Sequence, residues 1–447
     1  MSLSQQPLAY GRSAMNAPVS EERRVLRRAA SAAFMGNFVE WFDYAAYGYL
    51  AAVIAVVFFP QTDKVSGLLA TFAVFALSFI VRPIGGIVWG HIGDRFGRRN
   101  ALSLSILIMS GSTFCIALLP GYAQAGLAAP GLLLAIRLVQ GFSASGEYAG
   151  ASAFLAEYAP EGKRGFYTCL VPASTAAGLL VGSLFAAQLY THLDSAQLHE
   201  WGWRLPFLLA APLGLIGRYI RLHLADTPKF REMEAAMEQK QGQHRAPIRE
   251  LFGTHRKHLL VAVGATCLNA VAFYLILSYM PTYLSAEMGM SESDSFLAST
   301  VSLATYIGFI FLMGKLSDRF GRKTMLVAAS LLFLALTVPL FRLLGNQGFA
   351  FILLIQIGFG LMLAMNDGTL PCFLAEIFPT RVRYTGFAFS FNTANALFGG
   401  TAPFIATWLI SLTGNKLAPA WMLVAAAAVA LLAMLCVRET AHRPMED

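Results

Sequence analysis

Charge is what this sequence has least of. Only 13% of its 447 residues are Asp, Glu, Lys or Arg, whereas 56% are hydrophobic and the mean hydropathy is +0.58. A soluble chain usually carries about 25% charged residues. The apolar residues form runs of about 20 or more instead of amphipathic stripes, which excludes a string of soluble domains. The composition therefore indicates a polytopic membrane protein.

Cysteine clusters and phosphate-binding loops are also lacking. The five cysteines are scattered, without a CxxC pair or a Cys/His cluster, so we expect no disulfide framework, no metal and no cofactor. The sequence contains no GxxxxGK[ST] loop, which excludes ATP as the direct energy source. It also contains no nucleophile elbow of the kind that would indicate an enzyme. The formal charge of +8 is divided among short separate loops, so nucleic acid is not an expected partner.

What the sequence does contain is a series of apolar runs long enough to cross a hydrocarbon core of about 30 Å. The polar stretch 223–257 divides these runs into two sets of six, which predicts two six-helix bundles over 31–222 and 258–437. Residues 1–30 are expected to form a cytoplasmic N-terminal segment, and 438–447 a short cytoplasmic tail. The twelve predicted spans are 31–58, 66–91, 100–119, 130–157, 165–190, 204–222, 258–284, 294–315, 324–343, 348–374, 385–411 and 418–437.

The basic residues favour one orientation of these spans. With both termini in the cytoplasm, 27 of the 33 Lys and Arg residues fall on the cytoplasmic side and four on the outer side, counting Arg218 to Lys257 as central loop. Arg82 and Arg137 are the two that lie within spans. Such a bias predicts a multi-pass protein of the inner cell membrane, embedded in the lipid bilayer, with both termini cytoplasmic.

The two halves of the chain repeat one another. GHIGDRFGRR at 90–99 returns as GKLSDRFGRK at 314–323, so that Asp94 and Asp318 are 224 residues apart. Glu157 and Arg164 return as Glu376 and Arg383, each 219 residues later. A parallel six-span repeat is typical of secondary transporters whose solute site lies between the halves near the bilayer midplane.

The first predicted span has an unusually polar face. Spacings of three and four residues place Asn37, Glu40, Tyr44 and Tyr47 along one side of a helix, with Asp43 nearby. Ionisable side chains inside a membrane are costly, so we expect this face to line a polar cavity and bind solute. The alternative is that Glu40 and Asp43 pair with basic residues and lock spans together.

Two further spans of the first half contain an arginine. Gln140 and Glu147 are seven residues apart and share a face of the fourth span, near Arg137, whose planar guanidinium is suited to clamping a carboxylate. The alternative for Arg137 is a buried Arg–Glu pair without solute contact. Arg82 either faces the cavity or extends its side chain to the inner interface.

Polar residues inside the apolar runs are fewer in the second half of the chain. We predict solute contacts for Tyr274 in the seventh span, Asn366 in the tenth, and Asn392 and Asn395 in the eleventh. Asp367 is a further polar exception, and Gly368 and Pro371 are expected to break the helix beside it. The ordinary alternative for a membrane asparagine is a hydrogen bond between helices.

The doubled G-x-x-x-D-R-x-G-R-R/K loop resembles the signature of the major facilitator superfamily. Several stretches resemble its metabolite:proton symporter family, above all the proline/betaine permease branch and next the α-ketoglutarate and citrate permeases. Those stretches are GNFVEWFDYAAYGY (36–49), RPIGG (82–86), RLVQGFSASGEYAGA (137–151), EYAPEGKRGF (157–166) and WGWRLPF (201–207). The resemblance extends over 25–443 and implies an all-α integral membrane fold of twelve helices in two pseudo-symmetric bundles. Only a short tail follows the last span, so osmotic gating by a long C-terminal coiled coil is not expected.

The resemblance also implies roles for charged residues. The R-x-x-Q-G motif at 137–141 is tied to proton coupling in the family, which implies protons as the coupling ion and Glu40, Asp43, Arg137 and Glu147 as the coupling residues. The loop charges imply an inner gate between the halves and no contact with solute. The gate residues are Asp94, Arg95, Arg98, Glu157, Arg164, Asp318, Arg319, Arg322, Glu376 and Arg383.

These observations predict a proton-coupled importer of a small polar organic solute, functional as a monomer. A zwitterion such as proline or betaine is favoured, because Glu40, Asp43 and Glu147 accompany the two arginines of the spans. The alternative is a di- or tricarboxylate such as α-ketoglutarate or citrate. A drug/proton antiporter is less favoured, because LVPASTAAGLLVGS (170–183) contains no Gly-Pro.

Overall fold

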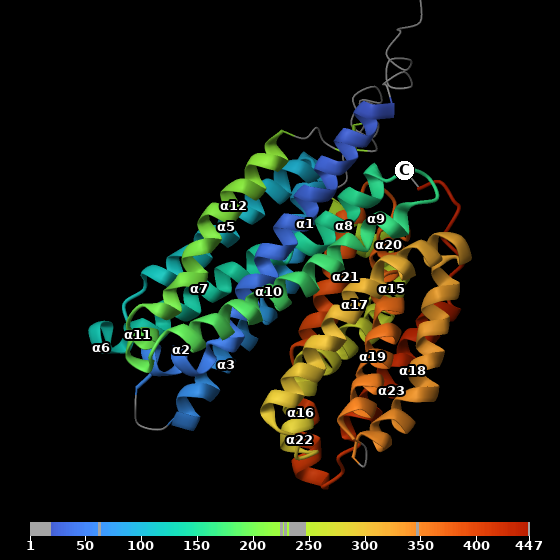
Figure 1. Cartoon of the computed structure of the whole chain (residues 1–447). Coiled ribbons are helices and arrows are strands. Elements are labelled where there is room, and N and C mark those ends of the chain that lie inside the picture. The colour runs from blue at the N-terminus through green and yellow to red at the C-terminus, as the bar shows by residue number, and fades with distance from the viewer. Residues whose placement is uncertain are drawn as a thin grey trace, which may run out of the picture.

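The computed structural model describes residues 19–60, 64–223, 227, 230–231, 247–345 and 348–445, and this part of the chain contains helices but no strand (Figure 1). The helices of the first half are α1 (Val19–Tyr49), α2 (Ala51–Phe58), α3 (Lys64–Ile80), α4 (Arg82–Phe96), α5 (Arg98–Leu118), α6 (Tyr122–Ala125), α7 (Ala128–Ala144), α8 (Glu147–Tyr158), α9 (Arg164–Thr168), α10 (Leu170–His192), α11 (Ser195–Glu200), the 3₁₀ helix η2 (Gly202–Arg204) and α12 (Leu205–Leu222).

The second half repeats this order. Its helices are α14 (Pro247–Thr254), α15 (Arg256–Ala272), the π-helix η3 (Phe273–Tyr279), α16 (Met280–Ala286), α17 (Glu292–Phe320), α18 (Arg322–Leu344), α19 (Phe349–Asp367), α20 (Leu370–Glu376), α21 (Arg383–Ala394), the π-helix η4 (Asn395–Gly399), α22 (Ala402–Thr413) and α23 (Ala418–Leu435).

Ten continuous helical segments in the described part are long and apolar enough to cross a membrane, and two bent pairs bring the number to twelve. Each of the twelve overlaps one of the runs predicted from the sequence, which confirms the twelve-span fold. The first two spans are not straight rods, since they bend by 70° at Leu50, between α1 and α2, and by 40° at Val81, between α3 and α4.

Proline and glycine explain most of the interruptions. Pro83 follows the bend at Val81, where it lacks the N–H that would continue the helix. The tenth span breaks between Asp367 and Leu370, at Gly368 and just before Pro371, as expected from the sequence. The eleventh span is distorted by the π-helix η4, which ends at Gly399. π-Helices and glycines are both common at distorted places in helices.

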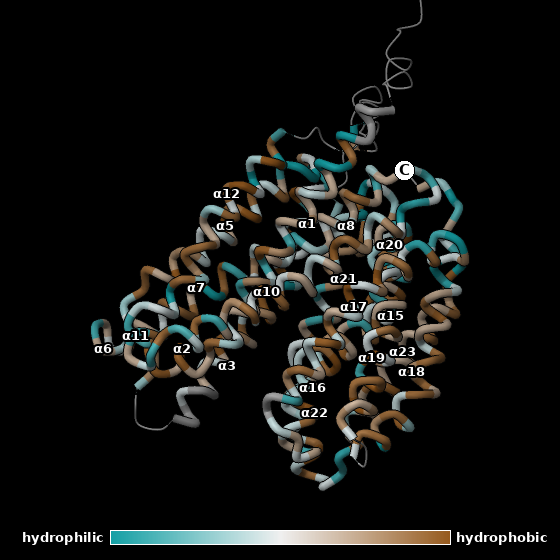
Figure 2. The backbone as a smooth tube through the Cα atoms, viewed as in Figure 1, coloured by the Kyte–Doolittle hydropathy of each residue, from teal (hydrophilic) through white to brown (hydrophobic). Residues whose placement is uncertain are grey.

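The helices form two bundles that lie side by side (Figure 1). Within the first bundle α1 packs on α10 and α5 on α12, and within the second α17 packs on α19 and α15 on α23. The bundles meet mainly through α4 against α21 and α10 against α17. We call the end where α4, α8, α17 and α20 finish the basic end; hydrophilic residues gather there and around the marked C-terminus (Figure 2).

The predicted central loop 223–257 lies mostly outside the described residues. Its described part includes α14, a short helix that packs against α4 and α21. Most of the predicted N-terminal segment 1–30 also falls outside the described part.

Candidate functional site

The first buried ion pair joins α1 to the start of α4. Arg82 stands directly after the bend in the second span and donates from Nη2 to Glu40 Oε1 at 2.7 Å and to the Tyr44 hydroxyl at 2.6 Å. Its guanidinium also lies 4.5 Å from the centre of the Phe79 ring. Arg82 is 3% exposed, so it neither reaches the membrane interface nor stands free, and Glu40 has the basic partner that the alternative interpretation allowed.

The second buried ion pair joins α1 to α7. Arg137 donates from Nη1 to Asp43 Oδ2 at 2.9 Å, and Gln140 Nε2 donates to the same oxygen at 3.3 Å. The Arg137 guanidinium lies 3.7 Å from the centre of the Tyr47 ring, and the Tyr47 hydroxyl donates to the Thr71 carbonyl at 3.1 Å. The structure thus brings together four residues that the sequence placed in the site.

Both pairs have hydrogen-bonding capacity left over. The buried atoms without a hydrogen-bond partner include Arg82 Nε, Arg137 Nε and Nη2, Glu40 Oε2 and Asp43 Oδ1. Buried polar groups are normally hydrogen-bonded, so such a group of donors and acceptors is typical of a place that takes up water or a polar solute. Because each arginine is matched by one carboxylate, the two pairs together carry no net charge.

An aromatic cluster lies between the bundles beside Arg82. Trp41 contacts Phe273 with ring centres 5.2 Å apart, and Phe79 contacts Tyr274 at 6.0 Å. The Tyr44 ring joins both contacts, lying 5.6 Å from Trp41 and 5.8 Å from Phe79. Tyr274 from η3 was predicted, and this cluster places it opposite the Arg82 pair.

Two predicted residues of the first half lie away from these pairs. Asn37 Nδ2 donates to α10, at the Val171 carbonyl (2.9 Å) and the hydroxyls of Ser174 and Thr175, and so joins α1 to α10. Glu147 accepts from both terminal nitrogens of Arg221, at 3.0 Å for Nη1–Oε2.

Counting Arg221 as a loop residue was wrong. It lies in the last turn of α12 and is 3% exposed, because its side chain turns inward to Glu147. Gln140 and Glu147 both reach α5, at Thr113 and Ser105, as their shared helical face predicts.

The three predicted asparagines of the second half are buried but do not converge. Asn392 Nδ2 donates to the Ser145 carbonyl of the first bundle at 2.7 Å. Asn395 Nδ2 donates within its own helix to Phe391, and Asn366 Oδ1 has no hydrogen-bond partner. Asn392 therefore has the interhelical role that was the ordinary alternative.

The repeated loop aspartates bind the helix starts of the opposite bundle. Asp94 accepts from the backbone N–H groups of Tyr384 (3.1 Å) and Thr385 (2.8 Å), at the beginning of α21. Asp318 accepts from Gly165 (2.8 Å) and Phe166 (2.9 Å), at the beginning of α9. A carboxylate at a helix N-terminus satisfies orphan N–H groups and complements the helix dipole, so each aspartate ties the bundles together.

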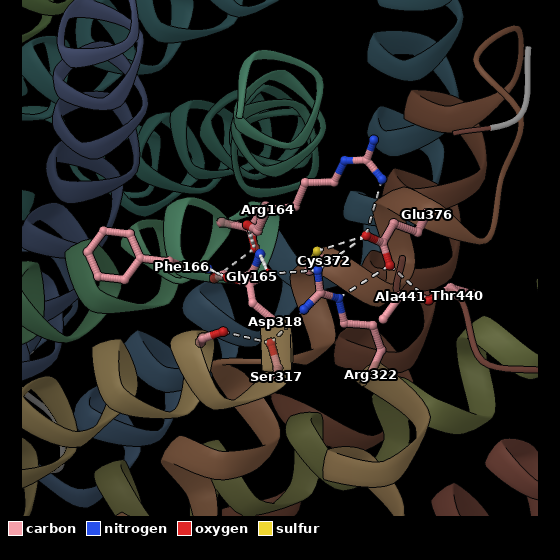
Figure 3. Close-up of polar contacts among 12 residues, drawn as sticks. Arg164, Gly165, Phe166, Ser317, Asp318, Arg322, Cys372, Glu376, Thr440 and Ala441 are labelled. Atoms are coloured by element: carbon pink, nitrogen blue, oxygen red, sulfur yellow. Dashed lines mark hydrogen bonds and ion pairs between the residues drawn. The ribbon is translucent and has the colours of Figure 1, made fainter. Parts of the chain in front are cut away.

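The glutamates and arginines of the repeat are paired crosswise between the bundles. Glu157 contacts Arg383 at 2.7 Å and Arg98 at 3.2 Å, while Glu376 lies 3.7 Å from Arg164. Figure 3 shows the second of these clusters, in which Glu376 also faces Arg322 at 3.3 Å. The neighbours in sequence, Glu157 and Arg164, are not the partners in space.

Arg95 and Arg319 do not join these clusters. Both are exposed, and the contact of each guanidinium is with the ring of the next residue, Phe96 or Phe320. Gly97 and Gly321 have φ values of 100° and 98°, which only glycine adopts readily, and this turn directs Arg98 and Arg322 inward instead.

Three buried polar residues were missed or left out of the predicted site. Arg221 looked like part of the central loop, and Asp367 was noted as polar without a role. Tyr306 gave no signal at all, because an isolated tyrosine in an apolar span is not distinctive. Its hydroxyl donates to Asp367 Oδ2 at 2.7 Å.

Comparison with known proteins adds to this geometry. A family model described as Major Facilitator Superfamily matches residues 33–305, and one described as Sugar (and other) transporter matches 225–447. A glycine betaine/proline/ectoine/pipecolic acid transporter, OusA of Dickeya dadantii, is 40% identical over 429 residues, covering 94% of this chain and 85% of the relative. The proline/betaine transporter of Escherichia coli is 38% identical with the same coverage. A citrate-proton symporter of Salmonella typhi is 38% identical over 409 residues, 90% of this chain and 92% of the relative.

Solved structures share the fold at low sequence identity. The proton:xylose symporter XylE bound to 6-bromo-6-deoxy-D-glucose superposes with a TM-score of 0.80 at 18% identity, covering 95% of this chain and 98% of that one. The transporter FucP in its outward conformation superposes with a TM-score of 0.66 at 16% identity, covering 91% of this chain and 97% of that one.

Proposed function

This chain belongs to the major facilitator superfamily and is a multi-pass membrane transporter, not an enzyme; we propose that its solute is a zwitterionic osmolyte or amino acid such as glycine betaine or proline, imported with protons. Protons are the coupling ion, and the transport cycle needs no other cofactor.

The observation that carries this proposal is the neutral charge of the two arginine–carboxylate pairs beside an aromatic cluster. A zwitterion brings a carboxylate and a cation together and needs one of each as partners. The unpaired nitrogens of Arg137 and the buried Trp41 Nε1 are donors for its carboxylate. The Arg82 guanidinium already lies over the Tyr44 and Phe79 rings, so the neighbouring Trp41 ring is the face for the solute's cation; quaternary ammonium groups are typically bound by aromatic rings.

A citrate or α-ketoglutarate molecule fits this site less well. Its two or three negative charges require surplus positive charge, whereas Glu40 and Asp43 already neutralise Arg82 and Arg137. The ranking of the relatives points the same way, since betaine and proline transporters align over 429 residues and the citrate symporter over 409.

The mechanism we propose is rocking of the two bundles about this central site. The carboxylates Glu40, Asp43 and Glu147, with Arg137, take part in proton coupling. The crossed charges at the basic end form a gate that holds this end closed while the opposite end admits solute. The basic end and both termini face the cytoplasm, the protein resides in the inner membrane, and a single chain embedded in lipid is sufficient.

The test is uptake by purified protein in proteoliposomes with an inward proton gradient. Labelled glycine betaine and proline are expected to accumulate, and labelled citrate and α-ketoglutarate are not. Arg137→Gln is expected to abolish uptake, because one ion pair and the free guanidinium donors are lost together. Membrane insertion and thermal unfolding are measured on the same variant.

Accumulation of citrate or α-ketoglutarate without accumulation of betaine or proline would make the di- or tricarboxylate alternative the correct one. Uptake by Arg137→Gln at the wild-type rate would remove Arg137 from the site. Betaine accumulation that persists after the proton gradient is collapsed would contradict proton coupling.

A further inference from the structure

The second bundle contains one buried carboxylate that the mechanism above does not use. Asp367 is the last residue of α19 and is 1% exposed. Its Oδ1 accepts from Asn269 Nδ2 at 2.6 Å and its Oδ2 accepts from the Tyr306 hydroxyl at 2.7 Å. Within the described part of the chain, Asp367 forms no ion pair.

The buried carboxylates of the spans in the first bundle differ in this respect. Glu40 is paired with Arg82, Asp43 with Arg137, and Glu147 with Arg221. A carboxylate in a low-dielectric interior is stabilised as an anion by such a partner. Without a cation the charged form is costly, and binding a proton removes that cost.

The internal repeat places a tyrosine in the second bundle where the first bundle has an arginine. The offset of 224 residues that relates Asp94 to Asp318 also relates Arg82 to Tyr306. Where the first bundle has a guanidinium facing a carboxylate, the second therefore has a phenol. The phenol donates a hydrogen bond but carries no charge, so the two bundles hold their acids in different electrostatic surroundings.

Among the described residues, the titratable groups that face Asp367 or its phenol partner are uncharged near neutral pH. Tyr306 comes from α17, Tyr148 from α8 of the other bundle, and Cys169 from the residue between α9 and α10. Tyrosine and cysteine ordinarily titrate above neutrality, and the remaining partner, Asn269 on α15, does not titrate.

Asp367 also lies where a movement of the bundles changes its surroundings. Tyr148 of the first bundle is one of the groups near it, and its ring stacks on Phe391 of the second bundle, with ring centres 4.2 Å apart. The helix break between α19 and α20 follows immediately, and α20 ends at the gate residue Glu376. Separation of the bundles at the basic end therefore changes what surrounds Asp367.

We propose that Asp367, held by Asn269 and Tyr306, is a proton-binding site of the transporter, neutral while the basic end is closed, with its proton on Oδ2 donated to the Tyr306 hydroxyl oxygen, which can accept as well as donate. Its carboxylate takes one proton from water on the side open in one arrangement and returns that proton to water on the other side when the bundles exchange arrangements. No further reactant is needed. The inference rests on proton coupling as proposed above, and its test includes an arm that does not depend on the solute.

The first arm uses infrared difference spectroscopy of the whole protein in lipid, without solute, at about pH 7, where exposed carboxyl groups are ionised. The C=O stretch of a protonated carboxylic acid is expected in the wild type and is expected to disappear in Asp367→Asn. The matched variant Glu40→Gln removes a carboxylate that has an arginine partner, and it should leave the band in place. A band that survives Asp367→Asn, or that disappears in Glu40→Gln instead, overturns the proposal.

A second variant covers the case in which Asp367→Asn does not fold. Tyr306→Phe keeps the acid and removes one hydrogen bond to it, so the frequency of the band is expected to shift. A band at the unchanged frequency would show that the proton sits on another acid.

The second arm measures transport in proteoliposomes with labelled glycine betaine. Asp367→Asn is expected to lose accumulation driven by a proton gradient, down to the level of protein-free vesicles, while exchange of labelled for unlabelled betaine continues. Asp367→Glu restores an acid and should restore accumulation. Full accumulation by Asp367→Asn overturns the proposal. If the wild type neither accumulates nor exchanges betaine or proline, the proposed solute is wrong, and the infrared arm still decides the proton site.

Discussion

At the scale of single residues, the buried arginines and carboxylates of the first bundle depend on one another. Glu147 and Arg221 are 1% and 3% exposed, and each is the main charged partner of the other. Removing one member of such a pair leaves an uncompensated charge in the interior. Losing both members leaves a neutral site, which is far less costly.

This dependence gives a stability prediction. Glu147→Gln is expected to destabilise the protein by about 3–5 kcal/mol, because Arg221 stays buried without its anion. The double variant Glu147→Gln with Arg221→Met is expected to lose less stability than Glu147→Gln alone. Thermal unfolding in detergent measures both.

The exposed Glu161 offers a matched control for that comparison. Glu161→Gln changes the same chemical group at the surface and should alter stability by no more than about 0.5 kcal/mol. A double variant less stable than Glu147→Gln would contradict the interpretation of a mutually dependent pair.

At the scale of elements, the contact between α4 and α21 depends on small residues. A Cβ atom added at Gly90 would lie 2.4 Å from the Thr385 Cα, and one added at Gly86 would lie 2.9 Å from the Ala388 carbonyl oxygen. Both neighbours are backbone atoms, which cannot rotate away. The two helices can therefore come this close only because glycine occupies these positions.

Gly90→Ala is accordingly expected to disfavour the arrangement in which the basic end is closed, at a cost of about 1–3 kcal/mol for the overpacked contact. Spin labels on the basic ends of α4 and α21 should report a larger separation. Gly111→Ala is the control, since a Cβ there meets nothing within 4 Å. An unchanged separation in Gly90→Ala would mean that this contact does not hold the bundles together.

The start of α21 supplies a second prediction at this scale. Asp94→Asn removes the anion that binds two N–H groups of α21, so we expect slower turnover with unchanged equilibrium binding of solute. The symmetric variant Asp318→Asn loosens α9 and should have the same effect. Binding is measured by calorimetry and turnover by uptake. Loss of binding with normal turnover would exclude a gating role.

At the scale of the whole molecule, alternating access predicts that buried surface at the basic end becomes exposed in turn. Cys169 of the first bundle is fully buried, and a Cβ added at Gly314 of α17 would lie 2.8 Å from its sulfur. The thiol therefore lies in the contact between the bundles. Separation of the bundles is expected to open it to water.

Maleimide labelling of Cys169, with the other cysteines replaced, is thus expected to be slow in the resting protein and faster in Gly90→Ala. Cys436, which is exposed near the basic end, provides the control and should label equally in both backgrounds. Equal labelling of Cys169 in the two backgrounds would argue against a rigid movement of the bundles.

The residues that could be predicted are those whose signal is local. Glu40, Asp43, Arg82 and Arg137 stand out because a charge inside an apolar run is rare, and the structure brings them together as two pairs. Tyr306 and the role of Asp367 could not be predicted, because an isolated phenol and an acid at a helix break have no distinctive pattern. Their meaning depends on which side chains face them.

The sequence by itself determined the membrane class, the twelve spans, the repeat and the charged residues inside the apolar runs, because these follow from hydropathy, residue type and period. The tertiary structure decided the partners. Glu157 is paired with Arg383, 226 residues away, and Glu147 with Arg221 at the end of another helix. Which helix faces which, and how each is rotated, is set by packing between distant segments, and that decides whether a buried charge meets a cation, a phenol or a helix start.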